Sequence, residues 1–170
     1  MNDMSVQVRE RTIGWDDPRT GAKAGLGMAG IDFLRAVAEG RLPRPPISAF
    51  LDFQIVEVEH GRAVFSCRPQ EIHCNPMGTV HGGLSATLID SAAGCAIHST
   101  LGAGKVFGTV DLTTTLVRPI LPGGPQLFCA GQVLHQGRSI ATAEARVVDE
   151  TGTLYAYGHV TAKITVLSKD

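Results

Sequence analysis

Asp90 is the residue whose type and setting first suggest chemistry in this sequence. Between Ile72 and Gly104 it is the only Asp, Glu, Lys or Arg. Its neighbours are small or apolar, so a helix that carries it should be buried on most sides. A buried carboxylate is costly unless it is hydrogen-bonded or neutralised. Asp90 is therefore either a structural group, satisfied by a loop, Arg118 or Lys105, or a catalytic carboxylate.

A second candidate group stands where the same helix should begin, at His81, Gly82 and Gly83. A helix N-terminus has unpaired N–H groups and the positive end of the helix dipole, so it can hold a developing oxyanion. Glycine lets a substrate carbonyl approach the backbone, although it also simply permits a tight turn. Asn75 could orient a carbonyl or a water and His81 could polarise the same group, but both types often serve turns and caps.

The spacing of Gly82 and Asp90 restricts how they could act together. Eight residues separate them, which is about 12 Å along a helix axis. They cannot both touch one reacting carbon within one subunit. A site that uses both must combine Gly82 of one chain with Asp90 of another, which predicts a symmetric dimer.

The element that must position these residues is a single helix, predicted over residues 82–101. It is accompanied by a loop over 70–81 and by six predicted strands, over residues 51–58, 62–68, 106–117, 126–135, 139–149 and 153–166. The last strand alternates from Leu154 to Val166 between apolar and more polar side chains, which is typical of an antiparallel sheet with one buried face. The prediction is an α+β fold with about six antiparallel strands wrapped around one long buried helix.

The chain before this sheet reads as a separate extension. Residues 1–28 are polar and glycine-rich and are expected to have little fixed structure. One short helix is predicted within residues 29–40, followed by an extended proline-rich connector over 42–48. We therefore expect an N-terminal extension over 1–45 and the main domain over 46–170.

Composition narrows the functional classes. The 170 residues carry a formal charge of −1 and are 44% hydrophobic, so a globular domain is expected and a nucleic-acid binder is not. The sequence shows no signal peptide and no membrane span, and its four cysteines form no paired motif. These features favour a reduced, cytoplasmic protein. The His and Cys residues fit no metal-ligand spacing, and the glycines of residues 25–30 follow no strand, so neither a metal nor a cofactor is expected.

The motifs together resemble a known family. Residues 75–83, Leu88-Ile89-Asp90 and Gly94 resemble hotdog-fold acyl-CoA thioesterases of the phenylacetate-degradation type, relatives of 4-hydroxybenzoyl-CoA thioesterases. The likeness continues through residues 109–112, 118–119, 136–138 and the final alternating strand, and covers roughly residues 46–166. It implies a hotdog fold and hydrolysis of an acyl-CoA to a free acid and CoA.

The resemblance also implies roles for individual residues. Asp90 would attack the thioester carbon or activate a water, and the Gly82 N–H would bind the thioester oxygen from the facing subunit. His81 and Asn75 would lie nearby, and Thr109 would assist the carboxylate or the water. Strand alternation would place Thr109 on the same face as Asp111, and opposite Val110.

Substrate contacts are expected at three further residues, Gly83, Arg118 and Arg138, with the two arginines as candidates for the CoA phosphates. Met77, Leu84, Leu88 and Phe107 are candidates for an acyl pocket and equally for the core. Aryl, arylacetyl and medium-chain acyl groups all remain candidates, as do a homodimer and a homotetramer.

Two other functions are compatible with the same fold. One is a non-catalytic acyl-CoA-binding protein, and the other is an enoyl-CoA hydratase or dehydratase. Fold does not determine function, but a sensor would be expected to lack Asp90, and the spacing of Asn75, Gly82 and Asp90 favours hydrolysis.

Overall fold

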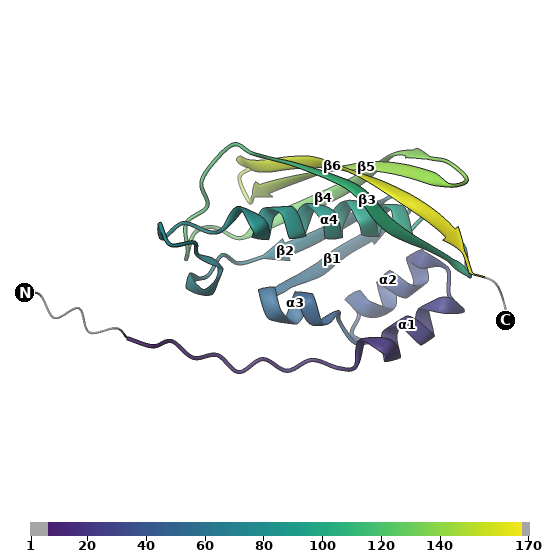
Figure 1. The fold of residues 1–170 in the computed structure, drawn as a ribbon, viewed down its shortest axis with the longest axis horizontal. Coiled ribbons are helices and arrows are strands. Elements are labelled where there is room, and N and C mark those ends of the chain that lie inside the picture. Colours follow the sequence, from purple (N-terminus) through teal and green to yellow (C-terminus); the bar gives the residue numbers. More distant parts are fainter. Residues whose placement is uncertain (1–6, 168–170) are drawn as a thin grey trace, which may run out of the picture.

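A computed structural model describes residues 7–167 and contains one antiparallel sheet, one long central helix and a helical N-terminal segment (Figure 1). The strands follow the order β1-β2-β4-β5-β6-β3 across the sheet. In chain order the elements are α1 (Pro18–Leu26), α2 (Gly30–Ala38), α3 (Pro46–Leu51), β1 (Phe53–Glu59), β2 (Arg62–Cys67), a 3-10 turn (Glu71–His73), α4 (Gly82–His98), β3 (Lys105–Leu116), β4 (Leu127–Gln136), β5 (Ile140–Asp149) and β6 (Leu154–Val166).

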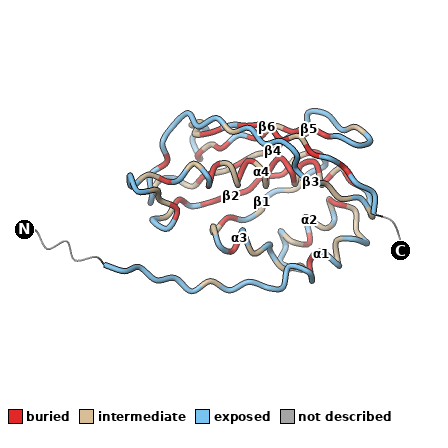
Figure 2. The backbone as a smooth tube through the Cα atoms, viewed as in Figure 1, coloured by how far each residue is buried: buried red, intermediate tan, exposed pale blue. Residues whose placement is uncertain are grey.

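Helix α4 lies in the concave face of the curved sheet and contacts all six strands. Much of α4 is buried (Figure 2). Its inward residues, such as Ile89 and Ile97, are completely buried, and burial of each such side chain stabilises the fold by about 1.5–3 kcal/mol. At Gly131 of β4, an added Cβ would lie 2.2 Å from the carbonyl oxygen of Ala92. The helix can therefore approach the sheet this closely only because glycine stands there. The predicted α+β architecture is confirmed.

Strand β6 follows the predicted alternation. Its inward residues from Ala156 to Ile164 are buried, while Tyr157, His159 and Lys163 are exposed. The turn before it is held by Asp149, whose side chain accepts hydrogen bonds from Thr151 and Thr153. This strand pairs with β5 on one side and with β3 on the other.

Strand β3 departs from the predicted alternation at one residue. Its pairing with β6 matches Thr109 to Ala162 and Asp111 to Thr161, so Val110 is an extra residue in a β-bulge. Residues directly opposite each other in an antiparallel pair share a face. Thr109 therefore faces α4 with buried Ala162, whereas Asp111 lies on the outer face. The expectation that Thr109 and Asp111 share a face is wrong, because a bulge reverses the alternation beyond it.

The N-terminal segment is more ordered than the sequence predicts. Residues 1–28 were expected to have little fixed structure, yet Pro18–Leu26 form α1, whose first turn is capped by the Asp17 side chain at 2.9 Å from the Arg19 nitrogen. Residues 7–45 thus hold two helices, α1 and α2, not one. Residues 1–6 of the predicted extension lie outside the part of the chain that the structure describes. The end of the connector, expected to be extended, forms the start of α3. The domain boundary at residue 46 stays a prediction.

Candidate active site

The Asp90 carboxylate is held by one side chain. The Thr109 hydroxyl donates a hydrogen bond of 2.8 Å to Asp90 Oδ1. Among residues 7–167 neither Arg118 nor Lys105 forms an ion pair with it. The expectation of a buried carboxylate is wrong, since Asp90 is half-buried and lines a cavity. Asp90 is therefore oriented by a hydroxyl and not paired with a cation, and its Oδ2 accepts no side-chain hydrogen bond from residues 7–167.

The contact between Thr109 and Asp90 depends on the β3 bulge. Regular alternation with Thr113 and Thr115 would have turned Thr109 to the outer face, where those two residues lie opposite His159 and Tyr157. The extra residue Val110 turns Thr109 toward α4 instead. Bulges often redirect a side chain beside a functional site in this way.

The first N–H group of α4, that of Gly82, has no acceptor among the described residues. His81 caps the helix, and its Nδ1 accepts the Gly83 N–H at 2.9 Å. A neutral His81 ring therefore carries its proton on Nε2. The Gly83 N–H is used within the chain, whereas the Gly82 N–H has no acceptor among residues 7–167. Gly82 is thus the donor at this helix end that a ligand could use.

Gly82 is the first residue of α4 and lies against the end of β3. A Cβ at Gly82 would lie 2.6 Å from Leu116 Cδ1, at the end of β3. Gly82 and Asp90 lie on the same α-helix, about 12 Å apart along its axis. The structure therefore does not bring these two residues into one site within a single chain.

Asn75 is engaged in its own loop. Its Oδ1 accepts the Met77 N–H at 2.8 Å, its Nδ2 donates to the Thr79 hydroxyl at 2.9 Å, and its backbone N–H donates to the Thr79 carbonyl at 2.8 Å. These bonds fix the loop that leads into His81. One Nδ2 hydrogen of Asn75 remains for a ligand.

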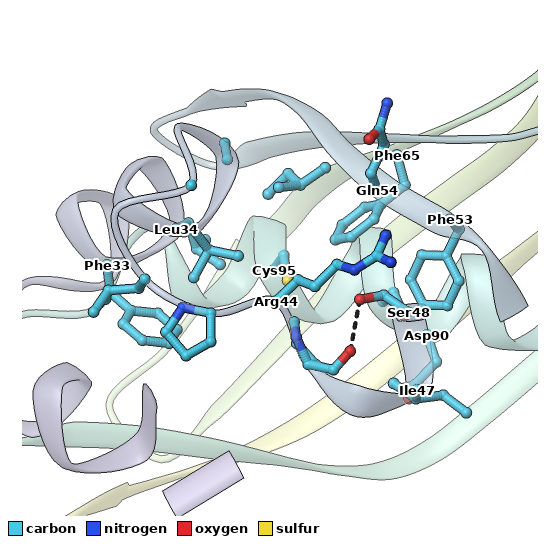
Figure 3. A pocket seen from close by; sticks show the side chains of 18 of the residues that line it. Phe33, Leu34, Arg44, Ile47, Ser48, Phe53, Gln54, Phe65, Asp90 and Cys95 are labelled. Atoms are coloured by element: carbon cyan, nitrogen blue, oxygen red, sulfur yellow. Dashed lines mark hydrogen bonds between the residues drawn. The ribbon is translucent and has the colours of Figure 1, made fainter. Parts of the chain in front are cut away.

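A cavity of about 470 Å³ opens beside Asp90 (Figure 3). Asp90, Ser91 and Cys95 of α4 form one wall. Burial, together with the Asp90 charge, raises the pKa of the Cys95 thiol to about 12, so Cys95 is a neutral wall residue and not a nucleophile.

The sequence analysis identified only part of this cavity. Of the four acyl-pocket candidates, Phe107 lines it. Leu84 and Leu88 are buried in the core, and Met77 is 85% exposed in the loop. The residues that were missed come chiefly from the N-terminal segment, where apolar side chains at helical spacing indicate only that a helix packs on something.

The two predicted CoA contacts lie far apart. Arg118 follows β3, beside Tyr155 at the start of β6, and Arg138 lies in the β4–β5 turn, near the end of β6. Strand β6 extends by about 3.3 Å per residue, so roughly 30 Å separates the two positions. One CoA phosphate group cannot contact both arginines of the same chain.

Two further findings concern metals and membranes. Within the part of the chain that the structure describes, no three His, Cys, Asp or Glu residues gather closely enough to hold a metal ion. No helix among the described residues is long and apolar enough to cross a bilayer.

Comparison with known proteins identifies the family. The Thioesterase superfamily model matches residues 77–156. Acyl-coenzyme A thioesterase 13 of Mus musculus is 33% identical over 109 residues, which cover 63% of this chain and 76% of that protein. The protein of the same name from Homo sapiens matches with the same identity and coverage. The chain belongs to the thioesterase superfamily.

Solved structures with low sequence identity share the fold. The PaaI protein from the phenylacetic acid degradation operon of E. coli superposes with a TM-score of 0.70 at 20% identity, covering 83% of this chain and 99% of that one. A phenylacetic acid degradation-related protein of Ralstonia eutropha gives 0.69 at 22% identity, covering 76% and 98%. These two structures confirm the fold that the resemblance implied.

Proposed function

We propose that this protein hydrolyses acyl-CoA thioesters to a free acid and CoA. The observation that carries the proposal is the Asp90 carboxylate, held by Thr109 at the wall of an apolar cavity. Membership of the thioesterase superfamily supports the reaction, and the acyl-coenzyme A thioesterases that are 33% identical support CoA as the thiol. Asp90 is the catalytic residue in this proposal.

Asp90 can act by either of two routes that use the same atoms. As a general base, it takes a proton from water while the water oxygen attacks the thioester carbon, and then returns the proton to the departing CoA sulfur. As a nucleophile, its carboxylate oxygen attacks the carbon, the C–S bond breaks and CoA leaves as the thiolate, which gives a mixed anhydride. Water then hydrolyses the anhydride to the free acid and restores the Asp90 carboxylate, and the proton that this water releases goes to the CoA thiolate. The Thr109 hydroxyl, 2.8 Å from Oδ1, fixes the carboxylate in both routes.

The thioester oxygen needs a donor that Asp90 cannot supply. The free Gly82 N–H at the start of α4 has the required chemistry, because a helix N-terminus stabilises negative charge. Since Gly82 and Asp90 of one chain lie too far apart, we propose that each site uses Gly82 of a second subunit. His81 and Asn75 accompany Gly82 in this arrangement.

Strand β3 supports association with a second copy. It is an edge strand of 12 residues, and a long open edge is a template for pairing with another chain. Its apolar side chains are uncovered, with Val110 60% and Leu116 55% exposed. Strand β3 also contains Thr109, which binds Asp90, and Leu116, which lies against Gly82. We propose a homodimer, at least, joined along β3.

Thiol release provides the first test of the proposal. The wild type is expected to release CoA from acyl-CoA thioesters and not to hydrate an enoyl-CoA. Asp90→Asn keeps the shape of the side chain and should lower kcat by about 10²–10⁴-fold, because it removes the base or nucleophile. Asp16→Asn, the same chemical change at an exposed residue before α1 and outside the sheet, is the matched control and should retain full activity.

Three outcomes would contradict the proposal. Near-native turnover by a folded Asp90→Asn variant would exclude Asp90 as the catalytic residue. Hydration of an enoyl-CoA without thiol release would assign the site to a hydratase. Binding of acyl-CoA without any turnover would make the protein a carrier or sensor.

A further inference from the structure

We infer that residues 33–48, which run from α2 through the connector to the first turn of α3, form the binding site for the acyl group, and that this group is uncharged, apolar and larger than a short-chain acyl. The inference rests on the proposed function. It assigns acyl selectivity to a segment that lies outside residues 77–156, the part that matches the family.

The cavity beside Asp90 is built mainly by this segment. Its remaining walls come from β1, β2, α4 and β3, and more than half of its lining residues belong to residues 33–48. Its volume of about 470 Å³ falls within the range of about 300–1,000 Å³ that is typical of small-molecule sites. A short acyl group would leave most of this apolar space without a partner.

Away from the Asp90 carboxylate, the walls of the cavity are mainly apolar. Phe33 and Leu34 of α2 line the cavity together with Phe53 and Phe65 of the sheet (Figure 3). Val37 of α2 also lines it. A thioester carbon at Asp90 would therefore direct its acyl chain toward α2. A charged chain end would lose its hydration among these side chains.

The polar groups of the segment do not alter this conclusion. The Ser48 hydroxyl is already used, because it donates to the Pro45 carbonyl at 2.8 Å (Figure 3). Arg44 lines the cavity but is exposed. Its aliphatic stem can therefore form apolar wall while its guanidinium remains in water.

Helix α2 is fixed above the cavity by close contacts with α4. The Gly30 N–H donates to the Leu101 carbonyl at 2.8 Å, and an added Cβ at Gly30 would lie 1.8 Å from the His98 carbonyl oxygen. The His98 ring stands 5.7 Å from the Phe33 ring and 5.6 Å from the Phe107 ring. The cavity is thus preformed, which favours selectivity by size.

The test fills the cavity and measures selectivity along a substrate series. The thioesters are butanoyl-, octanoyl-, dodecanoyl- and phenylacetyl-CoA, the last to distinguish an aryl from an alkyl occupant. The wild type should have a higher kcat/KM for the larger thioesters than for butanoyl-CoA. Val37→Phe should lower the ratio of dodecanoyl to butanoyl kcat/KM by about tenfold or more, since added bulk in an apolar pocket has effects of this size.

Two further variants guard against a folding effect. Ile47→Trp adds bulk to the cavity at a position that is 50% exposed, and it should change the same ratio. Asp32→Phe adds a ring to the exposed side of α2 and should leave the ratio unchanged. Equal losses for all chain lengths in both cavity variants, or wild-type preference for butanoyl-CoA, would overturn the inference.

Failure of the proposed function would look different. If the wild type hydrolyses none of the four thioesters, the catalytic proposal fails, and calorimetric titration tests the cavity alone. Tighter binding of dodecanoyl-CoA than of CoA, with the difference abolished in Val37→Phe, would sustain the inference. Equal binding of the two ligands would overturn it.

Discussion

At the scale of single residues, the proposed site combines a carboxylate and a helix N-terminus that one chain keeps apart. Asp90 has one partner, Thr109, at 2.8 Å, and the remaining carboxylate oxygen can face a ligand. Cys95, the other reactive residue type beside it, is held neutral because burial and the Asp90 charge raise its pKa to about 12. Of these two side chains, Asp90 is therefore the one to which the proposal assigns the chemistry.

The proposed oxyanion donor can be removed without disturbing the helix. Gly82 is the first residue of α4, where proline is favoured, and His81 has φ −62° and ψ 134°, which suits a residue before proline. Gly82→Pro removes the N–H and is expected to lower kcat by about 10²–10³-fold, the usual effect of losing one such donor. Steady-state kinetics with a medium-chain acyl-CoA measure the change.

Gly82→Ala is the matched control for this variant. It introduces the same Cβ, which meets the flexible end of the Leu116 side chain, but it keeps the N–H. Its kcat should stay within a few-fold of that of the wild type. If the alanine variant were as inactive as the proline variant, the effect would come from the contact with Leu116 and not from the N–H.

The sequence could identify Asp90 and Gly82 because their evidence is local: a lone charge in an apolar helix and glycines at its start. Only the family resemblance predicted that Thr109 assists Asp90. Regular alternation along β3 would put Thr109 on the outer face with Asp111, away from Asp90. The bulge at Val110 results from pairing with β6, so no pattern within β3 reveals it. For Asn75, the sequence allows both a catalytic and a structural role. Its side chain makes the loop contacts of an ordinary turn residue, and these contacts are compatible with either role.

At the scale of elements, the least predictable part is the N-terminal segment. Its glycines, among them Gly21 and Gly25, indicate breaks, but α1 forms because Pro18 and the Asp17 cap suit a helix start. The cavity beneath α2 was missed for a related reason. The spacing of Leu34 and Val37 predicts a packed helix, but not whether the helix packs against side chains or around a space.

The contact between α2 and α4 should make stability depend on pH. Burial lowers the pKa of His98, and burial likewise lowers the pKa of His73. Below the ordinary value of 6.5, the unfolded chain therefore binds protons that the folded protein resists. The free energy of unfolding should fall between about pH 7.5 and about pH 5.5, because stability decreases wherever the unfolded state binds more protons. Urea unfolding at the two pH values measures this change in the free energy of unfolding.

His98→Phe separates the contribution of this residue from that of His73. Phenylalanine keeps a ring between Phe33 and Phe107 but does not titrate. The variant should lose less stability than the wild type over the same pH interval. An unchanged pH dependence would show that His98 is not one of the groups responsible.

At the scale of the whole molecule, each feature of the site points to a second copy of the chain. The Gly82 N–H has no acceptor among the residues that the structure describes, and the long β3 edge is open and partly apolar. A dimer that pairs the two β3 edges would cover this surface and supply the missing donor. Catalysis and association would then depend on the same strand.

Complementation between two inactive variants tests this account most directly. In a mixed dimer of Asp90→Asn and Gly82→Pro subunits, one site carries both substitutions and the other carries neither. Random association makes about half of the dimers mixed, so about a quarter of all sites should be intact. Acyl-CoA hydrolysis by the co-refolded mixture should therefore recover to about a quarter of the wild-type rate. If mixed dimers form but the mixture is no more active than Asp90→Asn or Gly82→Pro alone, the shared site is contradicted.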